Sequence, residues 1–172
     1  MRRGSIFSLA IAFIWLLGGQ LSAAEKSEEK EHAELAKALK GAKISLEKGL
    51  SASESQGKPI SGKYELEDGK LQLSVYTMKG DKFSEVIVDH KSGKVAKTEA
   101  ITSGDDLKAA KSQSAAMAKA KLSLRAAAES AVKANKGFRA VIVTPSLKDG
   151  HPVADVTLVK GEQFKTTSEK LD

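Results

Sequence analysis

The sequence predicts an α+β protein built from two tandem repeats, each a helix packed on a three- to four-stranded antiparallel sheet, preceded by a cleavable signal helix. Three observations predict this fold. An apolar N-terminal leader gives way abruptly to charged, helix-favouring sequence. Hydrophobic residues then alternate with period two between tight-turn dipeptides. Finally, a set of sequence landmarks in the first half of the chain recurs in the same order in the second half.

Residues 1–24 have the organisation of a signal peptide. Two arginines follow the first methionine, and the apolar run from Ile6 to Leu17 comes next. As a helix this run covers about 18 Å, well short of the roughly 30 Å core of a bilayer. Ser22 and Ala24 are small enough for the −3 and −1 pockets of a signal peptidase. We therefore expect cleavage between Ala24 and Glu25, and a periplasmic or secreted protein with no membrane span after cleavage.

The charge and the cysteine count of the chain exclude several classes of function. The chain has 28 basic and 22 acidic residues, a formal charge of +6. Without Arg2 and Arg3 of the leader, 26 basic and 22 acidic residues leave a charge of +4, with both signs interspersed. Nucleic-acid binders cluster their basic residues and add stacking aromatics, so we expect no nucleic-acid partner. The absence of cysteine excludes disulfides, thiolate metal sites, thiol nucleophiles and a lipid-bearing cysteine.

The mature chain divides into four segments. Helix-favouring composition, without glycine or proline before Gly41, predicts an N-terminal helix over residues 25–41. A first α+β unit follows at residues 42–101, and an Ala-rich linking helix at residues 102–119. A second α+β unit occupies residues 120–172. Units this small are expected to share a common core.

Local signals predict the elements of the first unit. Ser45 is placed to cap a second short helix that ends near Gln56. Alternation predicts a strand from Ile60 to Leu66, and Asp68-Gly69 predicts a two-residue hairpin turn. Because short links force neighbouring strands to be antiparallel, an antiparallel sheet follows. The further strands are expected at residues 71–76, 83–88 and 95–101.

The second unit repeats the landmarks of the first. The matched segments are residues 42–46 and 120–124, Asp68-Gly69 and Asp149-Gly150, and residues 79–83 and 160–164. Matches in the same order predict an internal duplication. The last strand of the second unit has no turn glycine after it, so this unit is expected to lack a fourth strand. The matched Phe83 and Phe164 are expected to anchor the two cores.

One stretch of the first unit points to a family. Val86-Ile87-Val88-Asp89-His90-Lys91-Ser92-Gly93-Lys94-Val95 is a strand ending in Asp, a turn with Gly and another strand. Together with the helix opening Ile44-Ser45-Leu46-Glu47 and the Asp68-Gly69 hairpin, it resembles the PepSY domain family. The resemblance covers residues 42–101 well. It extends to residues 120–172 through their helix and middle hairpins, but not through their last strand.

The resemblance implies a non-catalytic module. Members of the family occur beside extracytoplasmic peptidases, a role in restraining peptidase activity has been proposed for the domain, and some two-unit periplasmic proteins of this kind look like binders of hard metal ions. We expect a periplasmic PepSY-domain protein that binds a peptide or protein partner. The physical means we expect is addition of a strand to the last strand of the second unit, around Thr166 and Ser168.

The alternative function is periplasmic binding of a hard cation such as Ca²⁺ or a lanthanide, which takes several oxygen ligands. Alternation places Glu65 and Glu67 on one face of a strand, and Glu85 and Asp89 share a parity on another. The lysines interleaved with these carboxylates favour a mixed-charge, solvent-exposed sheet face instead.

No enzyme active site is predicted. No serine has the context of a catalytic nucleophile elbow, and no Gly-rich phosphate loop or zinc-type histidine spacing is present in the sequence. His32, His90 and His151 are expected to be solvated surface residues.

Overall fold

The computed structural model describes the backbone of residues 23–172 and side chains from Ser27 onward. The predicted signal peptide lies outside the described residues, apart from Ala23 and Ala24, which begin the first helix. No helix of the described part is long and apolar enough to cross a bilayer.

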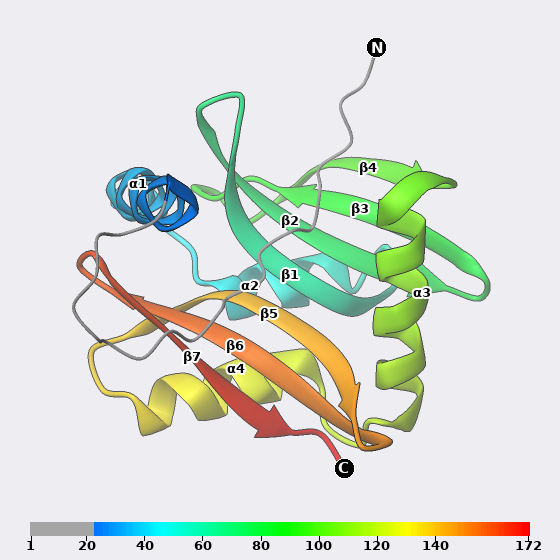
Figure 1. Ribbon diagram of the computed structural model, residues 1–172. Helices are drawn as coiled ribbons and strands as arrows, with labels where there is room; N and C mark the ends of the chain where they lie inside the picture. The colour runs from blue at the N-terminus through cyan, green and yellow to red at the C-terminus, as the bar shows by residue number, and fades with distance from the viewer. Residues whose placement is uncertain (1–22) are drawn as a thin grey trace.

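Four helices and seven strands make up residues 23–172. The helices are α1 (Ala23–Leu39), α2 (Leu46–Ser53), α3 (Gly104–Lys119) and α4 (Leu124–Ala134). The strands are β1 (Lys58–Glu67), β2 (Lys70–Lys79), β3 (Lys82–Val88), β4 (Val95–Ile101), β5 (Arg139–Lys148), β6 (His151–Lys160) and β7 (Gln163–Lys170). They form one antiparallel sheet in the order β4-β3-β2-β1-β5-β6-β7, which confirms the α+β class and joins the two expected sheets into one (Figure 1).

The helices lie on both faces of this sheet. Gly62 of β1 faces Leu46 and Leu50 of α2, whereas the preceding Ser61 donates a hydrogen bond to Gln113 of α3. Because adjacent strand residues point to opposite faces, α2 and α3 lie on opposite sides. We call the side of α2 the back and that of α3 the front. Helix α4 lies beside α2 on the back and packs on β5, β6 and β7 (Figure 1).

Helix α1 lies at one end of the molecule, near the β1–β2 and β6–β7 hairpins (Figure 1). Its buried Leu35 and Leu39 join the hydrophobic core, and it packs on β1 and β2. The guanidinium of Arg139 in β5 donates to the carbonyl of Leu39 at 3.3 Å and to that of Ile44 at 3.3 Å. A side chain of the second half of the chain, Arg139, therefore binds the C-terminal end of α1.

The predicted caps and turns are present. The Ser45 hydroxyl accepts a hydrogen bond from the N–H of Lys48 at 3.3 Å, and so begins α2, which ends at Ser53, short of the expected Gln56. Asp68 and Gly69 both have positive φ, at 48° and 74°. Such a pair matches the twist of an antiparallel hairpin and needs a Gly at the second position. Asp149 and Gly150 repeat this conformation at 53° and 80°.

The two halves match in further details. The register of the β1–β2 ladder shifts at Ile60, and that of the β5–β6 ladder shifts at Val141, the matching position of the second half. The N–H groups of the two residues before Ser45 donate to the carbonyl of His90, and those before Ser123 donate to the carbonyl of Leu171. Within residues 23–172 the first half alone has a further strand, β4.

Two expectations about aromatic and histidine side chains are wrong. Phe83 and Phe164 are half-buried at the margin of the core, whose largest fully buried side chains are Tyr64 and Tyr76. His32 is only partly exposed, because its ring stacks on Phe164 with centroids 4.3 Å apart. The matching of positions between the two halves pointed to these phenylalanines, but it does not show how deeply a side chain is buried.

One pair of facing positions in the back layer holds side chains of different size in the two halves. A Cβ on Gly49 of α2 would lie 2.4 Å from Cδ2 of the fully buried Leu73, so these two positions admit one large side chain. The corresponding positions of the second half hold Ala127 and Ala154, both buried.

This packing predicts coupling between Gly49 and Leu73. Gly49→Ala should destabilise the protein, because overpacking of about 1–3 kcal/mol exceeds the helix-propensity gain of up to ~1 kcal/mol. In a Leu73→Ala background the same change should become neutral or stabilising. Urea unfolding of the two single variants and the double variant measures this coupling, and additive effects would contradict the packing.

Candidate functional site

The backbone of β7 has one side directed away from the sheet. Lys160 pairs with Gln163 across a two-residue turn, and the N–H of Leu171 donates to the carbonyl of Pro152 at 3.0 Å. Hydrogen-bonded and non-hydrogen-bonded pairs alternate along an antiparallel ladder. The Lys160–Gln163 pair and the Leu171–Pro152 bond therefore lead to the same assignment. The main-chain groups of the odd-numbered residues of β7 bond to β6. The N–H and C=O groups of Phe164, Thr166, Ser168 and Lys170 point outward instead.

The corresponding edge of the first half is occupied. Strand β3 follows the same kind of two-residue turn, with Lys79 opposite Lys82. Its outer side pairs with β4, where Phe83 lies opposite Ile101 and Glu85 opposite Glu99. Phe164 and Thr166 hold the matching positions of β7. No strand of residues 23–172 pairs with β7 on that side.

The predicted Thr166 and Ser168 lie on this outer strand, with side chains on the front face. The Thr166 hydroxyl is 3.1 Å from that of Thr157. The Ser168 hydroxyl donates to the Asp155 carboxylate and accepts from the Lys148 ammonium. These bonds fix β7 against β6 through side chains. The outward main-chain groups at residues 166 and 168 therefore lie on an ordered strand.

One end of β7 carries an aromatic pair, Phe164 and His32, which we call the aromatic shelf. The two rings are nearly parallel, at 13°. On the opposite face of β7, the Lys165 ammonium lies 4.2 Å from the ring centroid of Phe138 and donates to Asn135 at 2.5 Å. The shelf thus offers an apolar surface at the end of an otherwise polar edge. Sequence reasoning missed it because His32 belongs to the N-terminal helix and Phe164 to the last strand, far apart in the chain.

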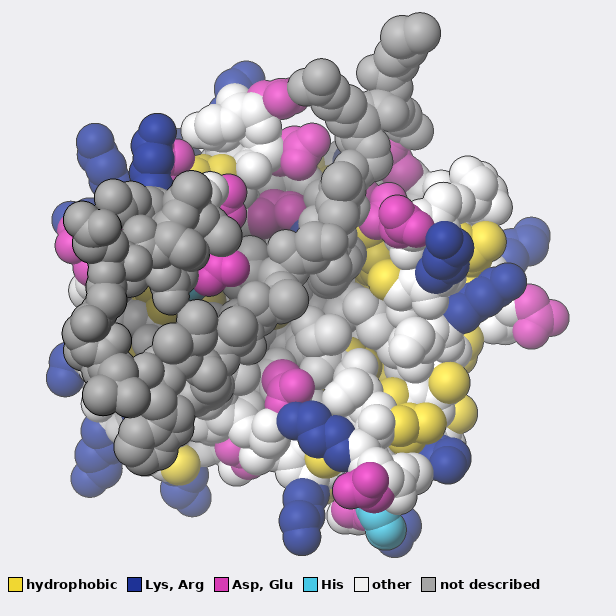
Figure 2. Space-filling view, in the orientation of Figure 1, with side chains coloured by type: hydrophobic (Ala, Val, Ile, Leu, Met, Phe, Trp, Pro, Cys, Tyr) yellow, Lys and Arg dark blue, Asp and Glu magenta, His cyan; other side chains and the backbone are white. Residues whose placement is uncertain are grey.

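The structure brings Glu65 and Glu85 onto the front face, where acidic side chains gather over the first half of the sheet (Figure 2). Glu67 is on the same face of β1, near the first hairpin. Glu65 pairs with Lys63 at 2.5 Å, and their side chains are only 17% and 9% exposed. The expectation of a solvent-exposed mixed-charge face is therefore wrong for this ion pair.

Glu85 is the most perturbed carboxylate of this face. It accepts a hydrogen bond from Ser74 at 2.8 Å, and Ser74 accepts one from Gln72 at 2.9 Å. Burial raises the pKa of Glu85, and the negative charge of Glu65 raises it further, against the lowering effect of Ser74.

Asp89 lies elsewhere, in the β3–β4 turn. It is exposed and accepts hydrogen bonds from the N–H groups of Ser92 at 2.6 Å and Lys91 at 3.1 Å, which lower its pKa. Its carboxylate orders the turn. Among the described residues, no three His, Cys, Asp or Glu side chains come together as a group that could hold a metal ion.

A buried hydrogen bond ties α3 to the front face. The Tyr76 hydroxyl donates to Asp106, in the first turn of α3, at 2.8 Å. Burial and the neighbouring carboxylates raise the pKa of Tyr76 far above its ordinary value, so it remains a donor at physiological pH. The sequence indicated that Asp106 begins a helix, but not that it contacts Tyr76.

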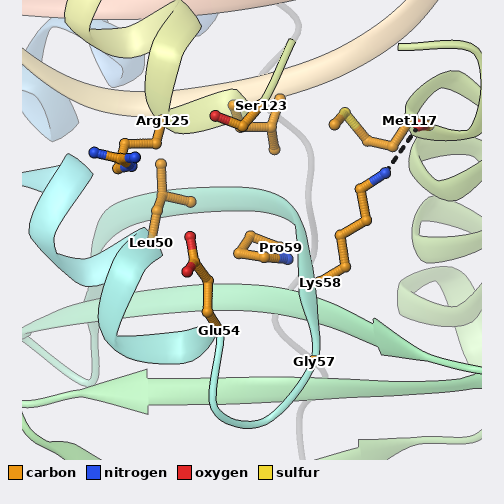
Figure 3. Close-up of a pocket in the computed structure, with 9 residues that line it drawn as sticks. Leu50, Glu54, Gly57, Lys58, Pro59, Met117, Ser123 and Arg125 are labelled. Carbon is orange, nitrogen blue, oxygen red and sulfur yellow. Dashed lines mark hydrogen bonds between the residues drawn. The ribbon is translucent and has the colours of Figure 1, made fainter. Parts of the chain in front are cut away.

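A small cavity of about 200 Å³ lies where the ends of α2 and α3 meet the start of α4 (Figure 3). Leu50, Pro59 and Leu124 give it a mainly apolar lining. At its margin the Lys58 ammonium donates to the carbonyl of Met117 at 3.2 Å, and the Ser123 hydroxyl caps α4. Both polar groups are therefore engaged within the protein, Lys58 between β1 and α3 and Ser123 at the start of α4.

Comparison with protein-family models, curated proteins and solved structures finds no match to this chain.

The raised pKa of Glu85 predicts a pH dependence of stability. A carboxyl group whose pKa is raised above 4.5 on folding binds protons more tightly in the folded state. The stabilisation that the protonated Glu85 carboxyl gives to the folded state is therefore lost as the pH rises from about 4.5 through the folded-state pKa. Glu85→Gln, which can still accept from Ser74, should flatten the pH dependence of the free energy of unfolding over this range. Urea titrations from pH 4 to 8 measure it, and an unchanged slope would contradict the assignment.

Proposed function

We propose that the protein is an exported, periplasmic or secreted, non-catalytic module of the PepSY type that captures an extended segment of a partner protein on the outer edge of β7. The carrying observation is the ordered outer strand whose counterpart in the first half is already paired with β4. An extended segment gains main-chain hydrogen bonds at such an edge without unfolding the module. A peptidase is among the partners that the family resemblance suggests.

The proposal includes descent of the two halves from one duplicated unit. Support comes from features that recur at a constant offset between the halves: the Asp-Gly turns, the ladder shifts at Ile60 and Val141, and the equal φ of 61° at Gly80 and Gly161. The hydrogen bonds to His90 and Leu171 are further support. On this account β7 corresponds to β3, and the partner's segment corresponds to β4.

The side chains of β7 favour a regulated interaction over aggregation. The strand is polar, with the sequence Gln-Phe-Lys-Thr-Thr-Ser-Glu-Lys, and lysines at an edge oppose uncontrolled strand pairing. Main-chain hydrogen bonds then supply affinity, and few side chains supply selectivity. This is the behaviour expected of a module that binds an extended segment mainly through its backbone.

Proline substitutions test the edge. Thr166→Pro or Ser168→Pro removes an outward N–H and keeps every main-chain bond to β6, so capture should be lost while the fold is kept. The side-chain bond of Thr166 to Thr157 is lost in Thr166→Pro and in Thr166→Ala alike. Thr166→Ala keeps the N–H and should retain capture. Thr98→Pro on β4, where Thr98 also lies between residues that bond to β3, is the matched control for the other edge of the sheet and should retain capture too.

The measurement is affinity capture from periplasmic extract on immobilised residues 25–172 of each variant, with circular dichroism melting to confirm folding. Proteins retained by the unsubstituted chain, Thr166→Ala and Thr98→Pro, but lost on Thr166→Pro, would support the proposal. Equal retention by the folded Thr166→Pro variant would contradict it.

A further inference from the structure

The paired edge in the first half gives a pattern for the segment that β7 would accept. We propose that this segment lies antiparallel to β7, places an aliphatic side chain against the aromatic shelf of Phe164 and His32, and carries an acidic residue opposite Lys170. This inference rests on the proposed function and adds the chemistry of the partner's segment.

The aliphatic position follows from the register of β3 and β4. Phe83 lies opposite Ile101, and both are half-buried against the core. Phe164 is the counterpart of Phe83, because each is the second residue of the strand that follows a two-residue turn. Side chains directly opposite on neighbouring strands have Cβ atoms about 4.5–5.5 Å apart, so an aliphatic residue opposite Phe164 contacts its ring. His32, stacked on the same ring, gives the shelf added apolar area that β3 does not have.

The acidic position follows from a reversal of charge. In the first half the N–H of Asp89, just after β3, donates to the carbonyl of Lys94, just before β4, at 2.8 Å, so the main chains of an acidic and a basic residue are paired at this end of the ladder. Lys170 stands at the position matching Asp89. Of the nearby acids, Glu169 accepts from Ser130 and Asp172 pairs with His151. An acidic residue of the partner is the complement to Lys170.

These two positions fix direction and register. Antiparallel pairing places the acidic residue six positions before the aliphatic one. Burial of the aliphatic side chain supplies most of the selectivity. The exposed ion pair contributes little and serves mainly to disfavour slipped registers. The residues opposite Phe164, Thr166 and Ser168 must also donate their N–H groups to β7, so the segment carries no proline at its third, fifth or seventh position.

A synthetic strand tests the pattern. The peptide EVKTEAI follows Lys94 and β4, with Lys94 replaced by Glu and with Ala96 omitted because the β3–β4 register shifts there. Its binding to residues 25–172 is measured by fluorescence anisotropy with a label on the N-terminus. EVKTEAS, without the aliphatic side chain, should bind about tenfold more weakly. KVKTEAI, with the acid reversed, should bind about two- to threefold more weakly.

Variants of the protein assign these differences to the shelf. Phe164→Ser should bind EVKTEAI and EVKTEAS equally. His32→Ala, which leaves the sheet untouched, should reduce the preference for EVKTEAI. Lys170→Ala should remove the preference for an N-terminal acid. Melting temperatures of all three variants confirm that they are folded before binding is compared.

The outcomes separate this inference from the proposed function. If all three peptides bind equally to the unsubstituted chain and none binds Thr166→Pro, the edge accepts a strand but the proposed pattern is overturned. If no peptide binds at millimolar concentration, or if Thr166→Pro binds EVKTEAI as well as the unsubstituted chain does, both proposals are overturned.

Discussion

The backbone pairing of Gly62 with Val143 joins the two halves of the protein, and the rest of the architecture depends on it. Strands β1 and β5 pair at only two positions, Gly62 with Val143 and Lys63 with Ile142. A Cβ on Gly62 would lie 2.9 Å from Cδ2 of Leu50, so the glycine lets α2 pack closely on this junction without a shift of Leu50. Gly62 therefore serves both the pairing of β1 with β5 and the close packing of α2 on the sheet.

This constraint determines where each edge of the sheet lies. Because the first strands of the two halves meet at the centre, the last strands of both halves lie at the outside. The first half ends in β4, which covers β3, whereas the second half ends in β7. Arg139 of β5 bonds to the carbonyls of Leu39 and Ile44 in the first half, and Gln113 of α3 accepts a hydrogen bond from Ser61 of β1. The outer position of β7 is thus a consequence of how the halves join.

Features that depend on neighbouring residues could be predicted from the sequence. The Asp68-Gly69 turn needs two residues with positive φ, and Ser45 caps the helix that begins beside it, so both are encoded locally. The alternation that predicted the strands is a local signal too, and Thr166 and Ser168 lie on β7, an outer strand of the sheet that residues 23–172 form.

Features that depend on distant contacts could not be predicted. Two residue pairs between β1 and β5 have no sequence signature, so the union of the sheets was not foreseen. The same holds for the stacking of His32 on Phe164 and for the burial of Lys63 with Glu65, because side-chain type alone does not reveal what covers a sheet face. Local chemistry predicted the strands, but tertiary packing decided which of their side chains are accessible.

Hydrogen exchange of backbone amides in residues 25–172, followed residue by residue by NMR, tests most directly whether β7 has a free outer edge. The account predicts slow exchange at Lys165, Thr167 and Glu169, which bond to β6, and fast exchange at Thr166 and Ser168. Glu85, the counterpart of Thr166, should exchange slowly because β4 covers it. Slow exchange at Thr166 and Ser168 in the monomeric free protein would contradict the account, because it would mean that this edge is already paired.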